Sequence, residues 1–397
     1  MRKISLSAQW LPKALTASVL AVLSMPAYSL WIDTPNVRDG LRFGAFVTIN
    51  PQLTHTSNKF TYTLGDPRIY GTEGTIAQVL ADQDRKDSDG RLRGDGVNSG
   101  FIQLVANQAL TKDLNIHGSV AVDYNKDGYY NYGALWGLGL EVRRFGSFTV
   151  GDGWTRLPVK KTDATNIIQN RGTNVAIEYT AIPNLTLAGY HMFTAASDVN
   201  NNRVSGWHRN HGVAAEYVFD FAPRKQLTVA AGAARGKGHQ NPYYVDTIIK
   251  GTSYMGSVSY QHNDLTLAVD YGKGRNTYNG IFIDDMDTTV FGAKATYEIT
   301  PRIKGTLSYA REVDDNSKPI SLDFLIDNGF GVDNWANFPV FDKTIQDRYK
   351  VGLDYQLYSR VKLSASVEKQ RTRNYVTEGE FSQRDRLYSS VGASFGF

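Results

Sequence analysis

The sequence predicts an all-β protein, a transmembrane antiparallel β-barrel of sixteen strands. Three observations lead to this fold class. Segments of about ten residues alternate between apolar and polar side chains along the chain after position 41. The connections between these segments are alternately short and long. A secretory leader stands at one end of the chain, and the other end is an alternating segment that finishes on Phe397.

Residues 1–29 are expected to be a cleaved signal peptide. Arg2 and Lys3 precede an apolar run at 14–23, and small residues follow at the position of a cleavage site. A retained helical anchor is the alternative, but the run is short for a bilayer span. We therefore expect residues 30–397 to form a single outer-membrane β-barrel domain.

The composition agrees with a barrel and excludes several other classes. After the leader, no stretch approaches the roughly 20 apolar residues that a spanning helix needs. The chain has 37 Gly, 23 Tyr, 18 Phe and a mean hydropathy of −0.36, so it is polar on average yet rich in residues of strands and membrane interfaces. The absence of cysteine excludes disulfides and cysteine metal sites. The formal charge of +4 includes Arg2, Lys3 and Lys13, which leaves +1 after the leader and does not indicate nucleic-acid binding.

The alternating segments predict the individual strands. In 114–124, Leu114 and Ile116 share one face, while Asn115 and His117 share the other. One face suits lipid and the other suits water. A soluble sandwich alternates in the same way, so the period alone leaves both folds open. The predicted strands lie at approximately 41–51, 98–110, 114–125, 134–144, 147–154, 174–182, 185–193, 211–220, 227–236, 252–262, 265–274, 287–299, 303–313, 346–357, 361–372 and 386–397.

The connections favour the barrel. Seven are tight turns and eight are longer loops, and the two kinds take turns along the chain. This asymmetry is typical of outer-membrane barrels, with turns on the periplasmic side and loops outside. Closure is then expected to pair 41–51 with 386–397, which leaves no exposed edge in the hydrocarbon. The longer loops are expected at 52–97, 126–133, 155–173, 194–210, 237–251, 275–286, 314–345 and 373–385.

Aromatic residues gather near the ends of the predicted strands. They fall on the apolar face, as expected for girdles at the two membrane interfaces. These residues are Tyr124, Trp136, Tyr179, Tyr217, Phe219, Tyr260, Tyr271, Tyr297, Tyr309, Tyr355, Phe395 and Phe397.

A barrel of this size is too wide for side chains to fill, so its lumen is expected to be an aqueous channel. No segment indicates a plug domain. The third loop opens with a mixed charged and apolar run at 153–163. Two placements follow from that run: the loop folds into the lumen as a constriction, or it lies over the mouth as a surface loop.

The order of strands and loops, the segment Phe-Gly-Ser-Phe-Thr-Val-Gly at 145–151 and the final Phe397 resemble the general diffusion porins of Gram-negative bacteria. The resemblance covers the mature chain in architecture and is specific at those two places. It implies sixteen strands, a homotrimer, a third loop folded inside each pore, and a terminal aromatic residue recognised by the barrel-insertion machinery. The chain lacks the family's Pro-Glu-Phe-Gly-Gly segment in the third loop and has Asp152 where many members place an arginine.

Selectivity is expected to follow the charges at the narrowest region, because charges near low-dielectric walls bias which ions enter. Charges that face inward by parity balance along the wall, and the third loop adds an excess of basic residues. The sequence therefore predicts a weak preference for anions. The candidate residues of the pore lining and constriction are Arg42, Asp123, Glu141, Asp152, Arg156, Lys160, Lys161, Asp163, Lys294, Arg348, Lys350, Lys362 and Arg386.

These features predict a channel in the outer membrane that passes small hydrophilic solutes and ions without an enzyme activity, a cofactor or a metal. The expected partners are outer-membrane lipid, further copies of the chain and the barrel-insertion machinery, with no nucleic acid. A channel specific for a sugar or an anionic solute is the first alternative, because Tyr129, Tyr130 and Tyr132 cluster in the second loop. A barrel hydrolase is a less favoured alternative, based on His208 and His211 together with Asp198.

Overall fold

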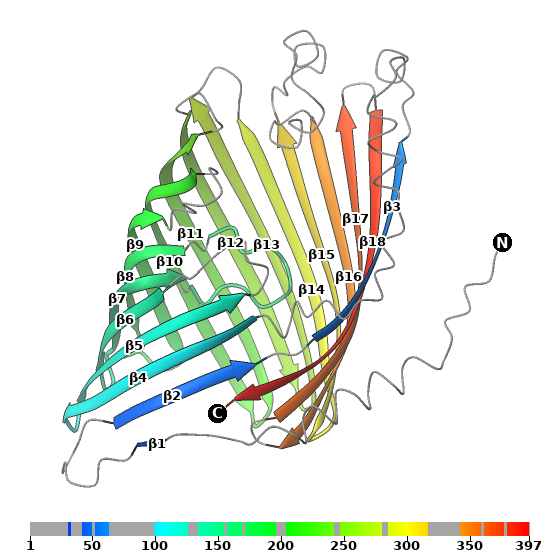
Figure 1. Cartoon of the computed structure of the whole chain (residues 1–397). Helices are drawn as coiled ribbons and strands as arrows, with labels where there is room; N and C mark the ends of the chain where they lie inside the picture. The colour runs from blue at the N-terminus through cyan, green and yellow to red at the C-terminus, as the bar shows by residue number, and fades with distance from the viewer. Residues whose placement is uncertain are drawn as a thin grey trace.

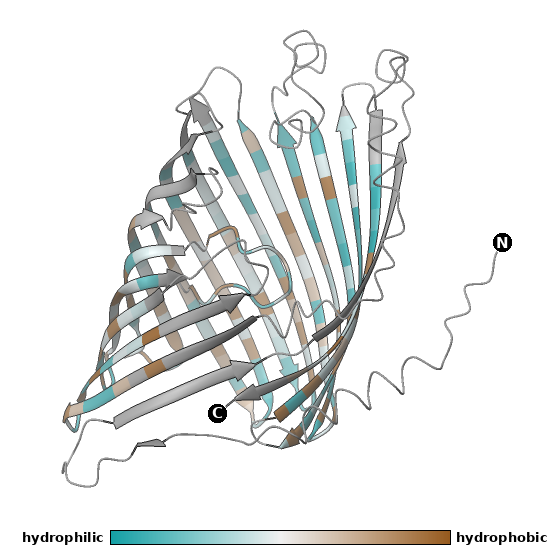
Figure 2. Cartoon of the chain, in the orientation of Figure 1, coloured by the Kyte–Doolittle hydropathy of each residue, from teal (hydrophilic) through white to brown (hydrophobic). Residues whose placement is uncertain are grey.

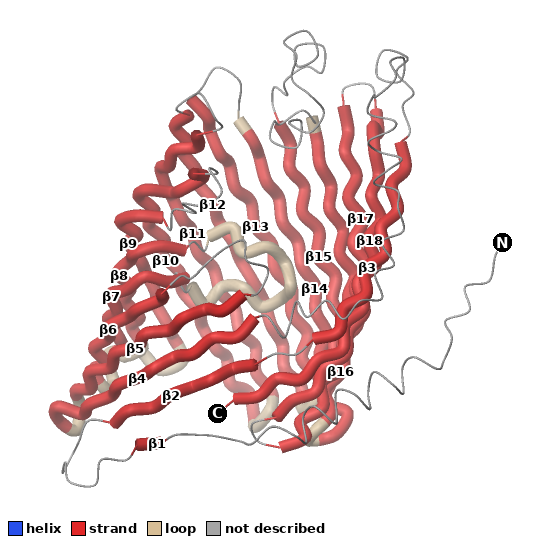
Figure 3. Tube along the Cα trace, in the orientation of Figure 1, coloured by secondary structure: helices blue, strands red, loops and turns tan. Residues whose placement is uncertain are grey.

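The structure, a computed structural model, describes residues 31–32, 42–49, 52–62, 99–125, 134–154, 157–168, 171–195, 204–241, 247–279, 285–316, 342–358, 361–376 and 379–396. Within these ranges every regular element is a β-strand (Figure 3). The strands form one curved antiparallel sheet (Figure 1).

The strands of this sheet are numbered β1 to β18 along the chain. They are β1 (Trp31–Ile32), β2 (Arg42–Ile49), β3 (Gln52–Tyr62), β4 (Ser99–Thr111), β5 (Leu114–Asn125), β6 (Ala134–Val142), β7 (Gly146–Trp154), β8 (Arg171–Tyr179), β9 (Leu185–Ala195), β10 (Val204–Ala222), β11 (Lys225–Asn241), β12 (Thr247–His262), β13 (Leu265–Asn279), β14 (Met286–Thr300), β15 (Ile303–Asn316), β16 (Lys343–Tyr358), β17 (Val361–Val376) and β18 (Gly379–Gly396).

The predicted strands agree with those observed. Each strand from β4 to β18 overlaps one predicted segment, and β2 overlaps the first. Several strands are longer than predicted because their ends carry polar residues that interrupt the apolar alternation. The prediction of a loop from position 52 is wrong for β3. This segment, Gln-Leu-Thr-His-Thr-Ser-Asn-Lys-Phe-Thr-Tyr, has few apolar residues to reveal its period, and it becomes a strand by pairing with β18.

Sequential strands pair from β4 through to β18. The first strands complete the order: β2 pairs with β4, and β18 pairs with β3 from Ser382↔Tyr62 to Gly392↔Gln52. Beyond that point β18 pairs with β2 at Phe395↔Ile49. The predicted pairing between segments 41–51 and 386–397 is therefore present only at Phe395↔Ile49 and Gly396↔Thr48, while the preceding part of β18 pairs with β3.

Tight turns join the strands at one edge of the sheet. Three of these turns place Asn184, Arg224 and Asn263 in the left-handed region, with φ of 64°, 59° and 53°. Asparagine adopts this conformation at lower cost than most residues, which suits it to a short hairpin. In one turn the Asn263 amide donates to the carbonyl of Arg224 at 2.8 Å, which ties two neighbouring turns together.

The two faces of the sheet have opposite character, visible as alternating colours along the strands in Figure 2. We call one the apolar face, where large hydrophobic side chains are exposed: Val213 is 64% exposed and Leu307 is 59% exposed. The other face carries buried polar groups, among them Asp270 at 0% exposure. A soluble protein of this size does not expose so continuous an apolar surface.

The predicted aromatic residues follow the same division. Those on the apolar face with large exposed fractions are Trp136, Tyr217, Phe219, Tyr260, Tyr271 and Tyr297. The side chains of Tyr124, Phe395 and Phe397 lie outside the described residues.

Candidate functional site: the third-loop segment and the wall beneath it

Residues 157–168, which we call the third-loop segment, connect β7 to β8 and lie across the polar face of the sheet (Figure 3). Apolar residues near its two ends attach it. Leu157, Val159 and Ile168 are buried and belong to one hydrophobic cluster with Met192 and Met255 of the wall. Each such side chain stabilises the attachment by roughly 1.5–3 kcal/mol through burial. We call the side of the sheet beneath this segment the loop-bearing face.

Small residues in the wall allow this close approach. A Cβ atom added to Gly292 in β14 would lie 2.0 Å from Oγ1 of Thr162, and one added to Gly232 in β11 would lie 2.9 Å from Cγ2 of Val159. A side chain at either position therefore displaces the segment. Glycine in a strand interior commonly marks such a close backbone approach.

Asp270 of β13 is the central polar attachment. Its carboxylate accepts hydrogen bonds from the Thr162 amide at 2.7 Å, from the Thr162 hydroxyl at 2.7 Å and from the Lys161 amide at 3.0 Å. Because the carboxylate is fully buried, these donors replace the water that it loses. The arrangement fixes the backbone of the segment as well as its side chains.

Asp163 makes the second attachment. Its two oxygens accept hydrogen bonds from Lys294 of β14 at 3.0 Å and from the Ser308 hydroxyl of β15 at 2.7 Å. Burial acts to raise the pKa of Asp163, but the hydrogen bonds from Ser308 and Lys294 outweigh it and hold the pKa below its ordinary value of 3.8. Asp163 is therefore ionised near neutral pH.

Further contacts extend the attachment to both sides. Lys161 forms an ion pair with Glu216 of β10. At the other end Thr165 donates to Glu312 of β15, and Arg348 of β16 donates to Thr165 at 3.2 Å. The segment thus bonds to strands from β10 to β16, which lie far apart in the sequence but side by side in the sheet.

Lys160 is the exposed charge of the segment. Desolvation lowers its pKa from the ordinary 10.5, with nearby Arg348 and Lys294 acting in the same direction and Asp163 and Asp270 opposing them. The ammonium group remains charged at neutral pH. It gives the free surface of the segment a positive potential beside Arg348 and Lys294.

The structure brings together a subset of the predicted site residues. Lys160, Lys161, Asp163, Lys294 and Arg348 meet at the third-loop segment. Lys350 is close enough to Asp163 to lower its pKa, and it alternates in β16 with exposed Val351 of the apolar face. These residues form one electrostatic group.

The other predicted residues lie elsewhere. Lys362 pairs with Asp354 at 3.5 Å near a turn, and Arg386 lies over the ring of Tyr388 at 5.3 Å. Glu141 is exposed at the turn end of β6.

Asp152 lies apart from the other predicted constriction charges. It is in β7, within the predicted strand 147–154, and its parity places its side chain on the same face as exposed Phe148. Its cross-strand partner is Trp136 of the apolar face. The structure therefore does not bring Asp152 to the third-loop segment.

Several predicted residues cannot be placed by their side chains. Arg42 and Asp123 lie in β2 and β5, but their side chains are outside the described residues. The same holds for the whole of Arg156 and Phe397.

Sequence reasoning missed the acceptor role of Glu312 and the contact role of Thr162. Parity indicates which face of a strand such residues occupy, but it does not reveal which loop they meet. The signal that remained in the sequence was the set of glycines at Gly232, Gly272 and Gly292, where a wall of alternating residues lacks side chains on its inner positions.

Of the two histidines in the alternative hydrolytic interpretation, the side chain of His208 lies outside the described residues, as does Asp198. His211 is exposed beside the apolar face and stacks with His191 at a ring distance of 6.3 Å. The described part of the chain contains no group of three His, Cys, Asp or Glu residues arranged to hold a metal ion. In that same part, no helix has the length and hydropathy to cross a membrane.

Solved structures share the fold of this chain. One is OmpT, an outer membrane protein of Vibrio cholerae, with a TM-score of 0.55, 12% identity, and coverage of 92% of this chain and 100% of that chain. An anion-selective porin from Comamonas acidovorans has a TM-score of 0.53 and 13% identity over 90% of this chain and 100% of that one. OmpF of Salmonella typhi, in a complex with daunomycin, has a TM-score of 0.51 and 13% identity over 93% and 100% of the two chains.

These likenesses show a fold of the Gram-negative porin type. No family model matches the sequence, and no curated protein matches it.

Proposed function

We propose that this chain is an outer-membrane porin. In this proposal sixteen strands close into a barrel, the third-loop segment lies in its lumen, and small hydrophilic solutes and ions cross by passive diffusion. The observation that carries the proposal is the reversed polarity of the sheet: large apolar side chains are exposed on one face, and carboxylates and hydroxyls are buried on the other. Both faces are satisfied when the apolar face meets lipid outside the barrel and the polar face meets water inside it.

Strand pairing supports closure. Only two residues separate β2 from β3, and the two act as one interrupted strand that pairs with β4 on one side and with β18 on the other. This composite strand and the fifteen strands from β4 to β18 make sixteen. A closed order leaves no unpaired edge, which the hydrocarbon requires.

The apolar face also has suitable dimensions. Tyr349 and Tyr358 of β16 are exposed at either end of a run that includes Val351 and Leu353. The nine steps from Tyr349 to Tyr358 extend about 30 Å along the strand, and a tilt of about 40° reduces this to about 23 Å across the membrane. An apolar band about 25 Å tall is typical of outer-membrane barrels.

The third-loop segment supports a constriction. It bonds to the wall through Asp270, Asp163 and Lys161, so it narrows the space enclosed by the loop-bearing face. Most charges in this group are paired, while Lys160 is exposed. The exposed positive charge of Lys160 supports a weak preference for anions. One such charge does not make a binding site for one particular solute.

The proposal includes a cleaved leader at 1–29, location in the outer membrane, three copies in the assembly, and no enzyme activity. The porin-type fold supports the location, and one solved OmpT structure of the same fold is a trimer form. An enzyme needs a supported polar constellation, whereas the polar groups described here bind the loop to the wall.

Liposome swelling with sugars of increasing size tests the proposal. A porin is expected to give swelling rates that fall smoothly with solute size and do not saturate with concentration. Rates that saturate for one sugar or one dicarboxylate favour the solute-specific channel. Liposomes that do not swell in any small sugar contradict the proposal.

A further inference from the structure

A cluster of charged residues lies on the apolar face, away from the third-loop segment. In β16 the side chains alternate: Arg348 contacts the loop on one face, while Tyr349 and Val351 are exposed on the other. Asp347 lies two positions before Tyr349, so the two side chains share the apolar face. Its bonded partner Arg311 of β15 confirms the assignment to the apolar face, because Arg311 lies four positions after exposed Leu307 and so shares its face.

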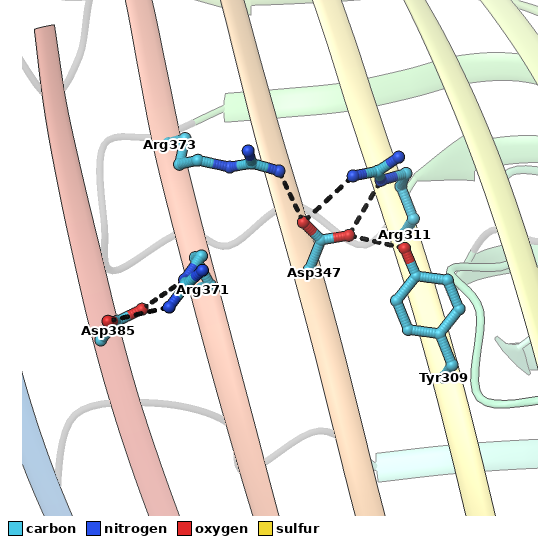
Figure 4. Close-up of polar contacts among 6 residues, drawn as sticks. All are labelled: Tyr309, Arg311, Asp347, Arg371, Arg373 and Asp385. Carbon is cyan, nitrogen blue, oxygen red and sulfur yellow. Dashed lines mark hydrogen bonds and ion pairs between the residues drawn. The ribbon is translucent and has the colours of Figure 1, made fainter. Parts of the chain in front are cut away.

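Figure 4 shows the cluster. Asp347 accepts hydrogen bonds from Arg311 at 2.8 Å, from Arg373 at 2.9 Å and from the Tyr309 hydroxyl at 2.7 Å. Beside it, Arg371 donates to Asp385 through Nε at 2.8 Å. Strands β15 to β18 each contribute one or two of these side chains.

The cluster lies just beyond the aromatic band. Tyr309 and Tyr349 pair across β15 and β16, and their rings are 4.9 Å apart. Arg311 and Asp347 are the next residues on this face, two positions or about 7 Å further along their strands. They lie on the side of the long connections, which the proposed function places at the outer leaflet. The depth is therefore that of lipid headgroups rather than of acyl chains.

The cluster has an excess of positive charge. Three arginines face two aspartates, and exposed Lys369 pairs in register with Tyr349 on the same face. Each guanidinium has five N–H donors, and Arg311 and Arg371 each use two groups on an aspartate. Nε of Arg373 is buried without a hydrogen-bond partner. The aspartates hold the guanidinium planes in place, and the Arg311 and Arg371 side chains remain partly exposed, with donors that the aspartates do not use.

We propose that this outward cluster binds the phosphate groups of an outer-leaflet lipid. Guanidinium groups recognise phosphate through paired N–H donors, and a fixed group of them recognises it better than isolated lysines do. The Asp347 side chain is only 4% exposed, whereas those of Arg311 and Arg371 are 43% and 38% exposed, so the accessible surface of the cluster is mainly basic. An apolar belt below the cluster contacts the acyl chains of the same lipid. The inference rests on the proposed function only for its membrane orientation.

Binding of lipid A to the purified full-length protein in detergent tests this inference, with dephosphorylated lipid A as the comparison probe. The variant Arg371→Gln with Arg373→Gln is expected to weaken binding of lipid A about thirty-fold, because each basic residue near an anionic lipid contributes about five-fold. Arg371→Gln alone leaves the Asp347 group intact and is expected to weaken binding about five-fold. Dephosphorylated lipid A is expected to bind weakly and equally to all forms.

The matched control is Arg224→Gln with Arg302→Gln, which removes two arginines from the turns at the opposite end of the strands. It is expected to bind lipid A like the unmodified protein, and Arg371→Lys with Arg373→Lys is expected to retain most of the affinity. Equal binding of both probes, or an unchanged affinity of the glutamine variant, overturns the inference. Loss of the oligomer with unchanged lipid binding also overturns it, since the face is then a subunit contact. Ion conductance is expected to persist in every variant, which separates failure of this inference from failure of the proposed function.

Discussion

Replacing Asp270 with alanine is expected to release the third-loop segment from the wall. The change removes the acceptor for the amides of Lys161 and Thr162 and for the Thr162 hydroxyl, and it leaves these donors buried. Each unsatisfied buried donor costs about 1–3 kcal/mol, so the loss of an acceptor for these three donors weakens the attachment by about 3–9 kcal/mol. Strand pairing is untouched, because Asp270 uses its side chain alone for these bonds.

The segment keeps its other attachments through Asp163, Lys161 and the apolar cluster, so it is expected to fluctuate rather than to leave the wall. Single-channel recordings in planar bilayers are expected to show increased current noise and a higher mean conductance. The size limit in liposome swelling is expected to rise. The thermal unfolding of the sheet is expected to change little.

The matched control is Asp354→Asn, which removes another charge of the loop-bearing face near a turn, where its partner is Lys362 at 3.5 Å. It is expected to leave the noise and the size limit unchanged. If Asp270→Ala has the same noise and the same size limit as the control, the segment is not held by Asp270 and the reasoning is refuted.

Three further predictions concern charge and lipid contact. Lys160→Gln is expected to shift the reversal potential in a salt gradient toward that of a cation-preferring channel. In the unmodified protein, the anion preference is expected to be lost as the pH rises through the pKa of Lys160, which lies below 10.5. A reversal potential that changes neither with the substitution nor with this rise in pH contradicts the prediction. Because the pKa of Asp163 is held below 3.8, its carboxylate is expected to hold the third-loop segment above the ordinary carboxyl pKa range and to release it as the pH falls through the lowered pKa. Current noise that already rises at pH 5 contradicts this prediction. Leu307→Arg on the apolar face is expected to destabilise the folded protein by about 2–4 kcal/mol in lipid, whereas Thr306→Arg on the opposite face has little effect, and equal unfolding free energies contradict the assignment of faces.

The strands were largely predictable because period-two alternation is a local property. It fails in β3, where Thr54, Thr56 and Ser57 give neither face an apolar row. It also fails at strand ends such as Asp385, which lies outside the predicted segment but inside β18. There the strand extends beyond the apolar band and the local signal disappears.

The site was predictable only in part. Parity places Glu216, Asp270 and Lys294 on the correct face, but their meeting with the third-loop segment joins residues more than 50 positions apart and leaves no local pattern. The sequence therefore left open whether the loop lies in the lumen or over the mouth. Asp152 was counted with the constriction charges because it lies next to the third loop in the sequence, although its parity with Phe148 places it on the apolar face.

Single-channel conductance of the purified protein in planar bilayers tests the central claim most directly, namely that the two faces of this sheet separate lipid from a water-filled interior. We expect stable current steps that are proportional to voltage and to salt concentration, and closures in thirds if three copies assemble. A bilayer that stays silent, with protein that remains soluble and compact without detergent, would contradict the account.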